Sequence, residues 1–233
     1  SRLWASAGPC LAKCLRSPPS PAGGTSGAMG ALLAGALLAG MPLAALGYDP
    51  ARRIESARLY SSRDRREYFV DLLVGSPYPQ RVSAVVDTTS ALSSFACAGC
   101  RHCGNHLDTG FDFTQSKSAR WIDCGNGCGV CRSGKCLFSQ SDSEGGQISG
   151  TWVSEMVSLG DARERNPPVR AALGCRSKET RRFFSRDANG ALGLAPGSSG
   201  QPTLLEEVFG DSANVNAKLF ALCFSEVGGV LTV

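Results

Sequence analysis

The residues of this chain best suited to chemistry are Asp87 and the three hydroxyl side chains that follow it, Thr88, Thr89 and Ser90. In residues 81–86, apolar side chains recur with a period of two, which predicts a β-strand with one face on a core. A carboxylate at the end of such a strand is costly to ionise unless hydrogen-bond donors surround it, and the next three residues supply hydroxyls and backbone N–H groups. We therefore expect an ionised carboxylate held at the end of a buried strand.

Two strands joined by a turn must position this carboxylate. Residues 68–75 read as a strand, and residues 76–80, which contain two prolines, read as the turn that leads into the strand ending at Asp87. Together these segments predict a β-hairpin that delivers Asp87.

The hairpin resembles the first lobe of a pepsin-like aspartic protease, in which a Gly-[Ser/Thr]-Pro turn and a second strand precede Asp-Thr-Gly-Ser. This chain has Val-Gly-Ser-Pro at 74–77 and Val-Val-Asp-Thr-Thr-Ser at 85–90, so Thr89 stands where that family has glycine. The resemblance implies a mostly β fold, the N-terminal lobe of a bilobal β-barrel acid protease. It also implies that Asp87 is catalytic and that Thr88, Thr89 and Ser90 support it, with Thr88 bracing two loops and Ser90 donating to the outer oxygen of Asp87.

Aspartic protease catalysis needs two carboxylates that share one proton, one to activate a water and one to polarise the scissile carbonyl. Asp87 supplies one, and the resemblance implies that a homologous second lobe supplies the other. We expect that lobe to follow Val233, so that this sequence is an inactive fragment of an aspartic endopeptidase acting on peptides or proteins. The alternative is an inactive lobe that binds peptides without cutting them, since Thr89 brings a β-branched side chain into the loop.

A second Asp-Thr-Gly sequence occurs at Asp108, Thr109 and Gly110. No apolar strand precedes it, and no hydroxyl run follows. We expect the carboxylate of Asp108 to be solvated and unpaired, and Asp87 to be the catalytic residue.

Cysteine is abundant, with eleven residues, nine of them after residue 47. This density favours disulfides in an oxidising compartment, and the spacing does not close into a standard four-cysteine zinc site, so we expect no metal and no cofactor. A zinc or interaction module remains an alternative. His102 and His106 are expected on the surface of a disulfide-bonded loop. The disulfide candidates are Cys97, Cys100, Cys103, Cys124, Cys128, Cys131, Cys136, Cys175 and Cys223, with Cys175 and Cys223 a pair to consider.

The segment 97–136 resembles the cysteine-rich insert of plasmepsin V-like enzymes, through Phe-x-Cys-x2-Cys-x2-Cys-Gly-x-His at 95–106. These enzymes are membrane-associated aspartic proteases of the secretory pathway. The resemblance implies the same pathway here, and a membrane segment outside this chain stays open.

A polar, glycine-containing turn lies between two further strand-like segments, 136–141 and 147–153, and predicts a protruding hairpin. In the resembling family this hairpin is the flap that closes over the substrate. Its tyrosine is absent, because Asp142 or Ser143 stands at that position, and we expect Trp152 to pack at the base. The predicted flap tip is Asp142, Ser143, Glu144, Gly145 and Gly146.

Three later segments complete the expected lobe. Residues 187–195 match a family landmark in which a glycine, here Gly193, lets one strand pass behind the aspartate loop. Thr203 and Glu206 form a capping box that opens a short helix through Phe209. Strands are expected at 156–160, 169–175, 218–226 and 230–233.

The sequence before this lobe divides into three parts. Residues 1–28 read as a disordered leader or a non-native extension, and residues 29–47 as a signal peptide cleaved before Tyr48, or as a signal anchor. Residues 48–67 read as a short basic pro-segment or linker, and 68–233 as the lobe. The net charge of +4, with no long Lys/Arg run, gives no support for a nucleic-acid partner.

Overall fold

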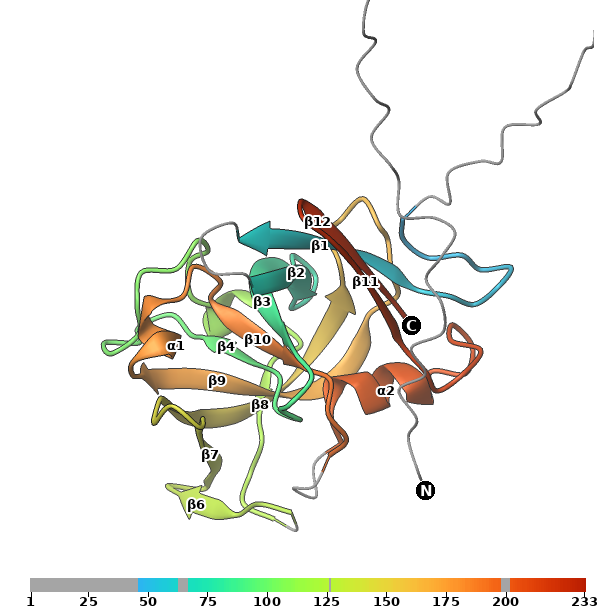
Figure 1. Cartoon of the computed structure of the whole chain (residues 1–233). Helices are drawn as coiled ribbons and strands as arrows, with labels where there is room; N and C mark the ends of the chain where they lie inside the picture. Colours follow the sequence, from blue (N-terminus) through green and yellow to red (C-terminus); the bar gives the residue numbers. More distant parts are fainter. Residues whose placement is uncertain (1–45, 63–66, 126, 198–201) are drawn as a thin grey trace, which may run out of the picture.

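The computed structural model describes residues 46–62, 67–125, 127–197 and 202–233, and these form one mixed, strongly curved β-sheet with two short α-helices (Figure 1). The mostly β fold expected from the sequence is confirmed. The elements are β1 (Ser56–Ser62), β2 (Glu67–Val74), β3 (Gln80–Asp87), β4 (Ser94–Ala96), a 3-10 turn (Phe113–Gln115), β5 (Arg120–Trp121), β6 (Val130–Arg132), β7 (Lys135–Ser141), β8 (Gln147–Leu159), β9 (Val169–Glu179), α1 (Arg182–Ser185), β10 (Gly190–Gly193), α2 (Leu204–Gly210), β11 (Ala221–Ser225) and β12 (Gly228–Thr232).

Six strands close into a ring. The order β2-β3-β10-β4-β9-β8 returns to β2, because Leu72–Val74 of β2 pair with Val157–Leu159 of β8. The ring encloses the main core, which includes Leu72, Val82, Phe95, Leu173 and Leu192, each at most 1% exposed. Full burial of each such side chain is worth about 1.5–3 kcal/mol, so the ring is a firm base for the loops at its ends.

The local elements expected around Asp87 are present. The β2–β3 hairpin pairs Phe69 with Val85, and β7–β8 forms the protruding hairpin with its turn at residues 142–146. Helix α2 begins at the expected capping box, in which Thr203 Oγ1 accepts from Glu206 N, and the Glu206 carboxylate accepts from Thr203 N. It packs against β9 and β10.

The segment 48–67, read from the sequence as a linker or pro-segment, contributes a strand to the sheet. β1 lies between β12 and β2, with Ala57 and Leu59 each 1% exposed. The phenol of Tyr48 donates to Asn214 Oδ1 at 2.7 Å. Removing this segment would take out a strand that is paired on both sides.

The leader at 1–28 and almost all of the signal segment at 29–47 lie outside the described residues. Among the helices that the structure does describe, none has the length and apolar character needed to span a membrane.

Candidate active site

Asp87 is the last residue of β3, at the point where β10 passes beside it in parallel. Gly193 of β10 pairs with Asp87, and Leu194 N donates to Asp87 O at 2.9 Å. A Cβ on Gly193 would lie 2.6 Å from the carbonyl carbon of Ala91, which no real Cβ contact permits. The crossing expected for residues 187–195 is therefore confirmed, and it requires glycine at 193.

The half-buried carboxylate of Asp87 is held by Thr89. Its Oδ1 accepts from Thr89 N at 2.9 Å and from Thr89 Oγ1 at 2.7 Å. Thr88 is exposed, and no hydrogen bond of its side chain is found within the described chain. Thr89, which stands where the family has glycine, thus supplies the hydroxyl donor to Asp87 that we expected from Ser90.

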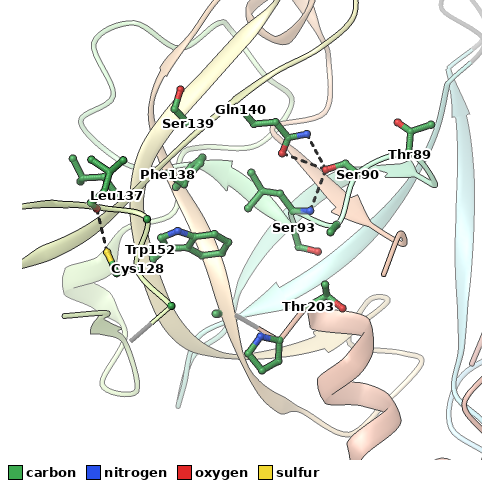
Figure 2. Close-up of a pocket in the computed structure, with 17 residues that line it drawn as sticks. Thr89, Ser90, Ser93, Cys128, Leu137, Phe138, Ser139, Gln140, Trp152 and Thr203 are labelled. Atoms are coloured by element: carbon green, nitrogen blue, oxygen red, sulfur yellow. Dashed lines mark hydrogen bonds between the residues drawn. The ribbon is translucent and has the colours of Figure 1, made fainter. Parts of the chain in front are cut away.

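The hydroxyl of Ser90 does not reach Asp87 as we expected. Ser90 is buried, and its Oγ lies 3.0 Å from Gln140 Nε2 on β7 and accepts from Leu92 N, also at 3.0 Å (Figure 2). The hydroxyl of Ser90 instead ties the loop after β3 to β7. Gln140 gave no signal in the sequence, because only the fold brings it to Ser90.

A groove of about 720 Å³ runs beside this loop (Figure 2). One side is the loop after Asp87, and another is β7 of the hairpin. Trp152 lines the groove and also packs on Phe138 with ring centroids 5.5 Å apart, so it does more than the packing at the hairpin base expected from the sequence. The lining also includes Thr89–Ser93, Gly127–Val130, Leu137–Gln140, Ala172, Pro202 and Thr203.

The hairpin tip is held on α1. Asp142 accepts from Glu144 N and Gly146 N, and its Oδ2 lies 2.6 Å from Arg182 Nε. Burial alone would raise the pKa of Asp142, but the bonds from Gly146 and Arg182 hold it below its usual value. Neither Asp142 nor Ser143 is among the residues that line the groove.

Asp108 is paired and largely buried, contrary to the expectation that it would be solvated. Its side chain is 12% exposed, its Oδ2 accepts from Ser83 N at 2.8 Å, and Arg81 Nε lies 3.5 Å from its Oδ1. Arg81 also pairs with the buried Asp71 at 3.2 Å. The loop carrying Asp108 folds back onto β3, where Arg81 pairs with both Asp71 and Asp108. Neither Asp108 nor Asp87 is among the residues that line the groove.

Between described residues, four disulfides join eight of the nine candidate cysteines: Cys97–Cys175, Cys100–Cys103, Cys124–Cys131 and Cys128–Cys136. The ninth, Cys223, is also disulfide-bonded. The pair Cys175–Cys223 is not formed. β4 runs parallel to β9 with Phe95 opposite Cys175, which puts Cys97 beside Cys175, whereas β11 lies at the far edge of the sheet. Within the described ranges, no three Cys, His, Asp or Glu side chains gather as metal ligands would.

The side chain of His106 is buried rather than on the surface, since it is 3% exposed. Its Nε2 lies 2.8 Å from Glu179 Oε2, and its Nδ1 lies 2.8 Å from Arg186 O. Burial lowers the pKa of His106, but the bonds to Glu179 and Arg186 outweigh it and raise the pKa above its usual value. His102 is exposed, as expected.

Glu179 is the centre of this buried cluster, because it also pairs with the buried Arg176 at 3.1 Å. Burial raises the pKa of Glu179, while His106 and Arg176 lower it, and the net direction is downward. The cluster joins the cysteine-rich segment to the end of β9, just before α1. A buried arginine on a strand has no reliable sequence signature, so the cluster could not be foreseen.

The family described as Xylanase inhibitor N-terminal matches residues 68–233. Aspartic protease 5 of Toxoplasma gondii is 40% identical over 215 residues, which cover 83% of this chain and 22% of that protein. Plasmepsin V of Plasmodium falciparum is 32% identical over 183 residues, covering 76% of this chain and 31% of that protein. Aspartyl protease family protein 2 of Arabidopsis thaliana is 32% identical over 150 residues, which cover 60% of this chain and 29% of that protein. The chain thus spans less than a third of the length of these relatives.

Proposed function

Because the chain belongs to the pepsin-like aspartic protease family, as the N-terminal lobe of such a protein, we propose that its parent is an aspartic-type endopeptidase of the secretory pathway. In this proposal Asp87 is one of two catalytic carboxylates. The second comes from a homologous lobe that follows Val233, and the substrate is a peptide held extended in the groove.

The observation that carries this proposal is the setting of the Asp87 carboxylate. It stands at the end of β3, beside the close crossing with β10, and Thr89 donates two hydrogen bonds to one of its oxygens. The other oxygen, Oδ2, receives neither of these bonds, and it can face a water or the partner carboxylate. One carboxylate of such a couple activates the water as a base while its protonated partner polarises the scissile carbonyl.

The groove supports the same proposal. The loop after Asp87 and the flap strand β7 form two of its sides, and the Ser90–Gln140 contact holds these two sides together. Asp87 does not itself line the groove, but Thr89, which donates to its carboxylate, does, so a peptide lying there would pass beside the end of β3.

Two observations support the secretory pathway. Disulfides persist in oxidising compartments, and eight cysteines of this lobe form four of them. The chain is also 32% identical to Plasmepsin V over 183 residues, in agreement with the resemblance of its 97–136 segment to plasmepsin V-like enzymes.

The experiment is to express the chain with the coding sequence that follows Val233 in an oxidising compartment, and to measure cleavage of an internally quenched peptide library at acidic pH. Asp87→Asn should abolish cleavage. Asp108→Asn is the matched control, because it alters the other Asp-Thr-Gly while its amide oxygen can still accept from Ser83 N. Cleavage that survives in Asp87→Asn, or that is lost only in Asp108→Asn, would overturn the assignment of Asp87.

The second candidate is a lobe that binds peptides without cutting them. Thr89 favours it, since the family keeps glycine there, and so does the matching family's description as an inhibitor. This candidate predicts that the folded protein retains peptides from the same library at equilibrium and releases them uncut. Cleavage that depends on Asp87 rules it out.

A further inference from the structure

One wall of the groove is a cysteine-bonded segment, residues 124–136. Gly127, Cys128, Gly129 and Val130 line the groove together with Leu137 and Trp152 (Figure 2). The segment belongs to the 97–136 insert, whose cysteine spacing by itself indicates only a disulfide framework. The structure makes part of that framework a surface of the groove.

Packing contributes little to the position of this wall. Of the described residues from 124 to 136, all but Cys128 and Cys136 are exposed, and only Cys136 is fully buried. A segment with so few buried apolar contacts would open readily by itself. Four glycines, at 125, 127, 129 and 134, add backbone freedom.

Two disulfides hold the wall instead. Cys131 and Cys136 face each other across the β6–β7 hairpin, yet neither bonds to the other. Cys131 bonds back to Cys124 and Cys136 bonds back to Cys128, so each strand of the hairpin is tied to the loop before it. Cys128 Sγ also lies 3.1 Å from Val130 O, which places the second disulfide directly against the residue at the groove.

The chemistry of the groove is apolar and uncharged at this place. None of the described lining residues carries an ionisable side chain. Val130 is 59% exposed although it is apolar, and Trp152 and Phe138 lie nearby in the same groove. An uncharged site with an apolar wall disfavours a charged side chain, which would lose its hydration without gaining a partner.

We propose that the wall formed by residues 127–130 determines specificity, with Val130 selecting an uncharged apolar side chain of the bound peptide. The disulfides Cys124–Cys131 and Cys128–Cys136 are the positioning elements for this contact. This inference rests on the proposed function, in that the groove receives an extended peptide.

The first test varies the wall itself. Fluorogenic peptides that differ only at one central position, carrying Leu, Phe, Asp or Lys, are compared on the wild-type protein, Val130→Asp and Leu107→Asp. Leu107 is the control, since it is 62% exposed and outside the groove. Val130→Asp should lower kcat/KM for the best apolar peptide about tenfold. It should also reduce the ratio of kcat/KM for that peptide to kcat/KM for the Lys peptide. An unchanged preference order in Val130→Asp, or the same change in Leu107→Asp, overturns the proposal.

The second test removes the positioning disulfide. Cys128→Ala/Cys136→Ala is compared with Cys100→Ala/Cys103→Ala, which deletes a disulfide of the same insert outside the groove lining. Loss of Cys128–Cys136 should raise KM about tenfold with kcat changed less than about twofold, because binding is lost rather than chemistry. It should also speed hydrogen exchange at residues 127–130, whereas the control should not. Equal KM values in the two double variants overturn the positioning role.

These tests remain decisive if the proposed function fails. Should the wild-type protein cleave none of the peptides, equilibrium affinities for the same set, read from tryptophan fluorescence, replace kcat/KM. A loss of affinity confined to Val130→Asp and Cys128→Ala/Cys136→Ala then supports the wall in a binding protein. Equal affinities across all variants, or no binding by the wild-type protein, overturn the proposal that residues 127–130 determine specificity.

Discussion

Gly193 of β10 lies against the loop that carries Asp87, so closely that the backbone of Ala91 occupies the place where a side chain would begin. Leu194 N and Ala195 N then donate to Asp87 O and Ser90 O at 2.9 and 3.0 Å. The shape of the loop after Asp87 therefore depends on a strand that arrives about a hundred residues later in the chain.

Gly193→Ala should destabilise the lobe by about 1–3 kcal/mol, because the new methyl group meets backbone atoms at 2.6–2.8 Å and the loop must move. Urea unfolding followed by tryptophan fluorescence measures this. Gly210→Ala is the control, since a Cβ there would meet nothing within 4 Å. A variant as stable as Gly210→Ala would contradict the close crossing.

Thr89→Val should lower kcat of the parent protein about tenfold or more, because a hydrogen bond to a charged group is worth about 1.5–3 kcal/mol and Thr89 Oγ1 donates one to Asp87 at 2.7 Å. Thr89→Ser keeps the hydroxyl and should keep most of the activity. Steady-state kinetics on one peptide compare the two. If both variants lose activity equally, the hydroxyl is not the group that matters.

His106 and Glu179 should stabilise the lobe most between about pH 4.5 and 6.5, the ordinary pKa values of Glu and His. The pKa of Glu179 is lowered on folding, so its contribution is present above 4.5 and is lost as pH falls through the lowered value. The pKa of His106 is raised, so its contribution is present below 6.5 and is lost as pH rises through the raised value.

His106→Gln should therefore cost about 3 kcal/mol within this window and progressively less on either side. Urea unfolding from pH 4 to 8 measures the difference from the wild-type protein. His102→Gln changes the exposed histidine and should cost little at any pH. A loss of stability in His106→Gln that does not vary with pH would contradict an ion pair between His106 and Glu179.

Glu55 should make the lobe less stable as pH rises from 4.5 to about 7. Its side chain is 1% exposed, and no partner for either carboxylate oxygen is found in the described part of the chain. Burial, with a smaller effect of Asp211, raises its pKa to about 7. The folded state thus holds the proton more tightly than the unfolded state, and ionisation above the raised pKa costs on the order of 3 kcal/mol.

Glu55→Gln should remove this pH dependence and should be more stable than the wild-type protein at pH 8. Thermal unfolding between pH 4 and 8 checks it, with Glu226→Gln, which alters an exposed carboxylate, as the control. If the two variants respond to pH in the same way, Glu55 is not the group that titrates.

The sequence alone determined the local elements of the site. Alternating apolar residues and a proline-containing turn were enough to predict the β2–β3 hairpin and the place of Asp87 at its end, because strand periodicity and turn chemistry are properties of neighbouring residues. The same holds for the hairpin with its tip at 142–146 and for the capping box of Thr203 and Glu206.

Only the tertiary structure decided which side chains meet. The partner of Ser90 is Gln140, that of Cys175 is Cys97, and that of His106 is Glu179, pairs separated by 50, 78 and 73 residues. Asp108 and His106 are buried because loops return over β3 and β9, where charged partners offset the loss of hydration. Composition and spacing do not predict where these loops lie, because the path of each loop depends on how the closed ring of strands directs it.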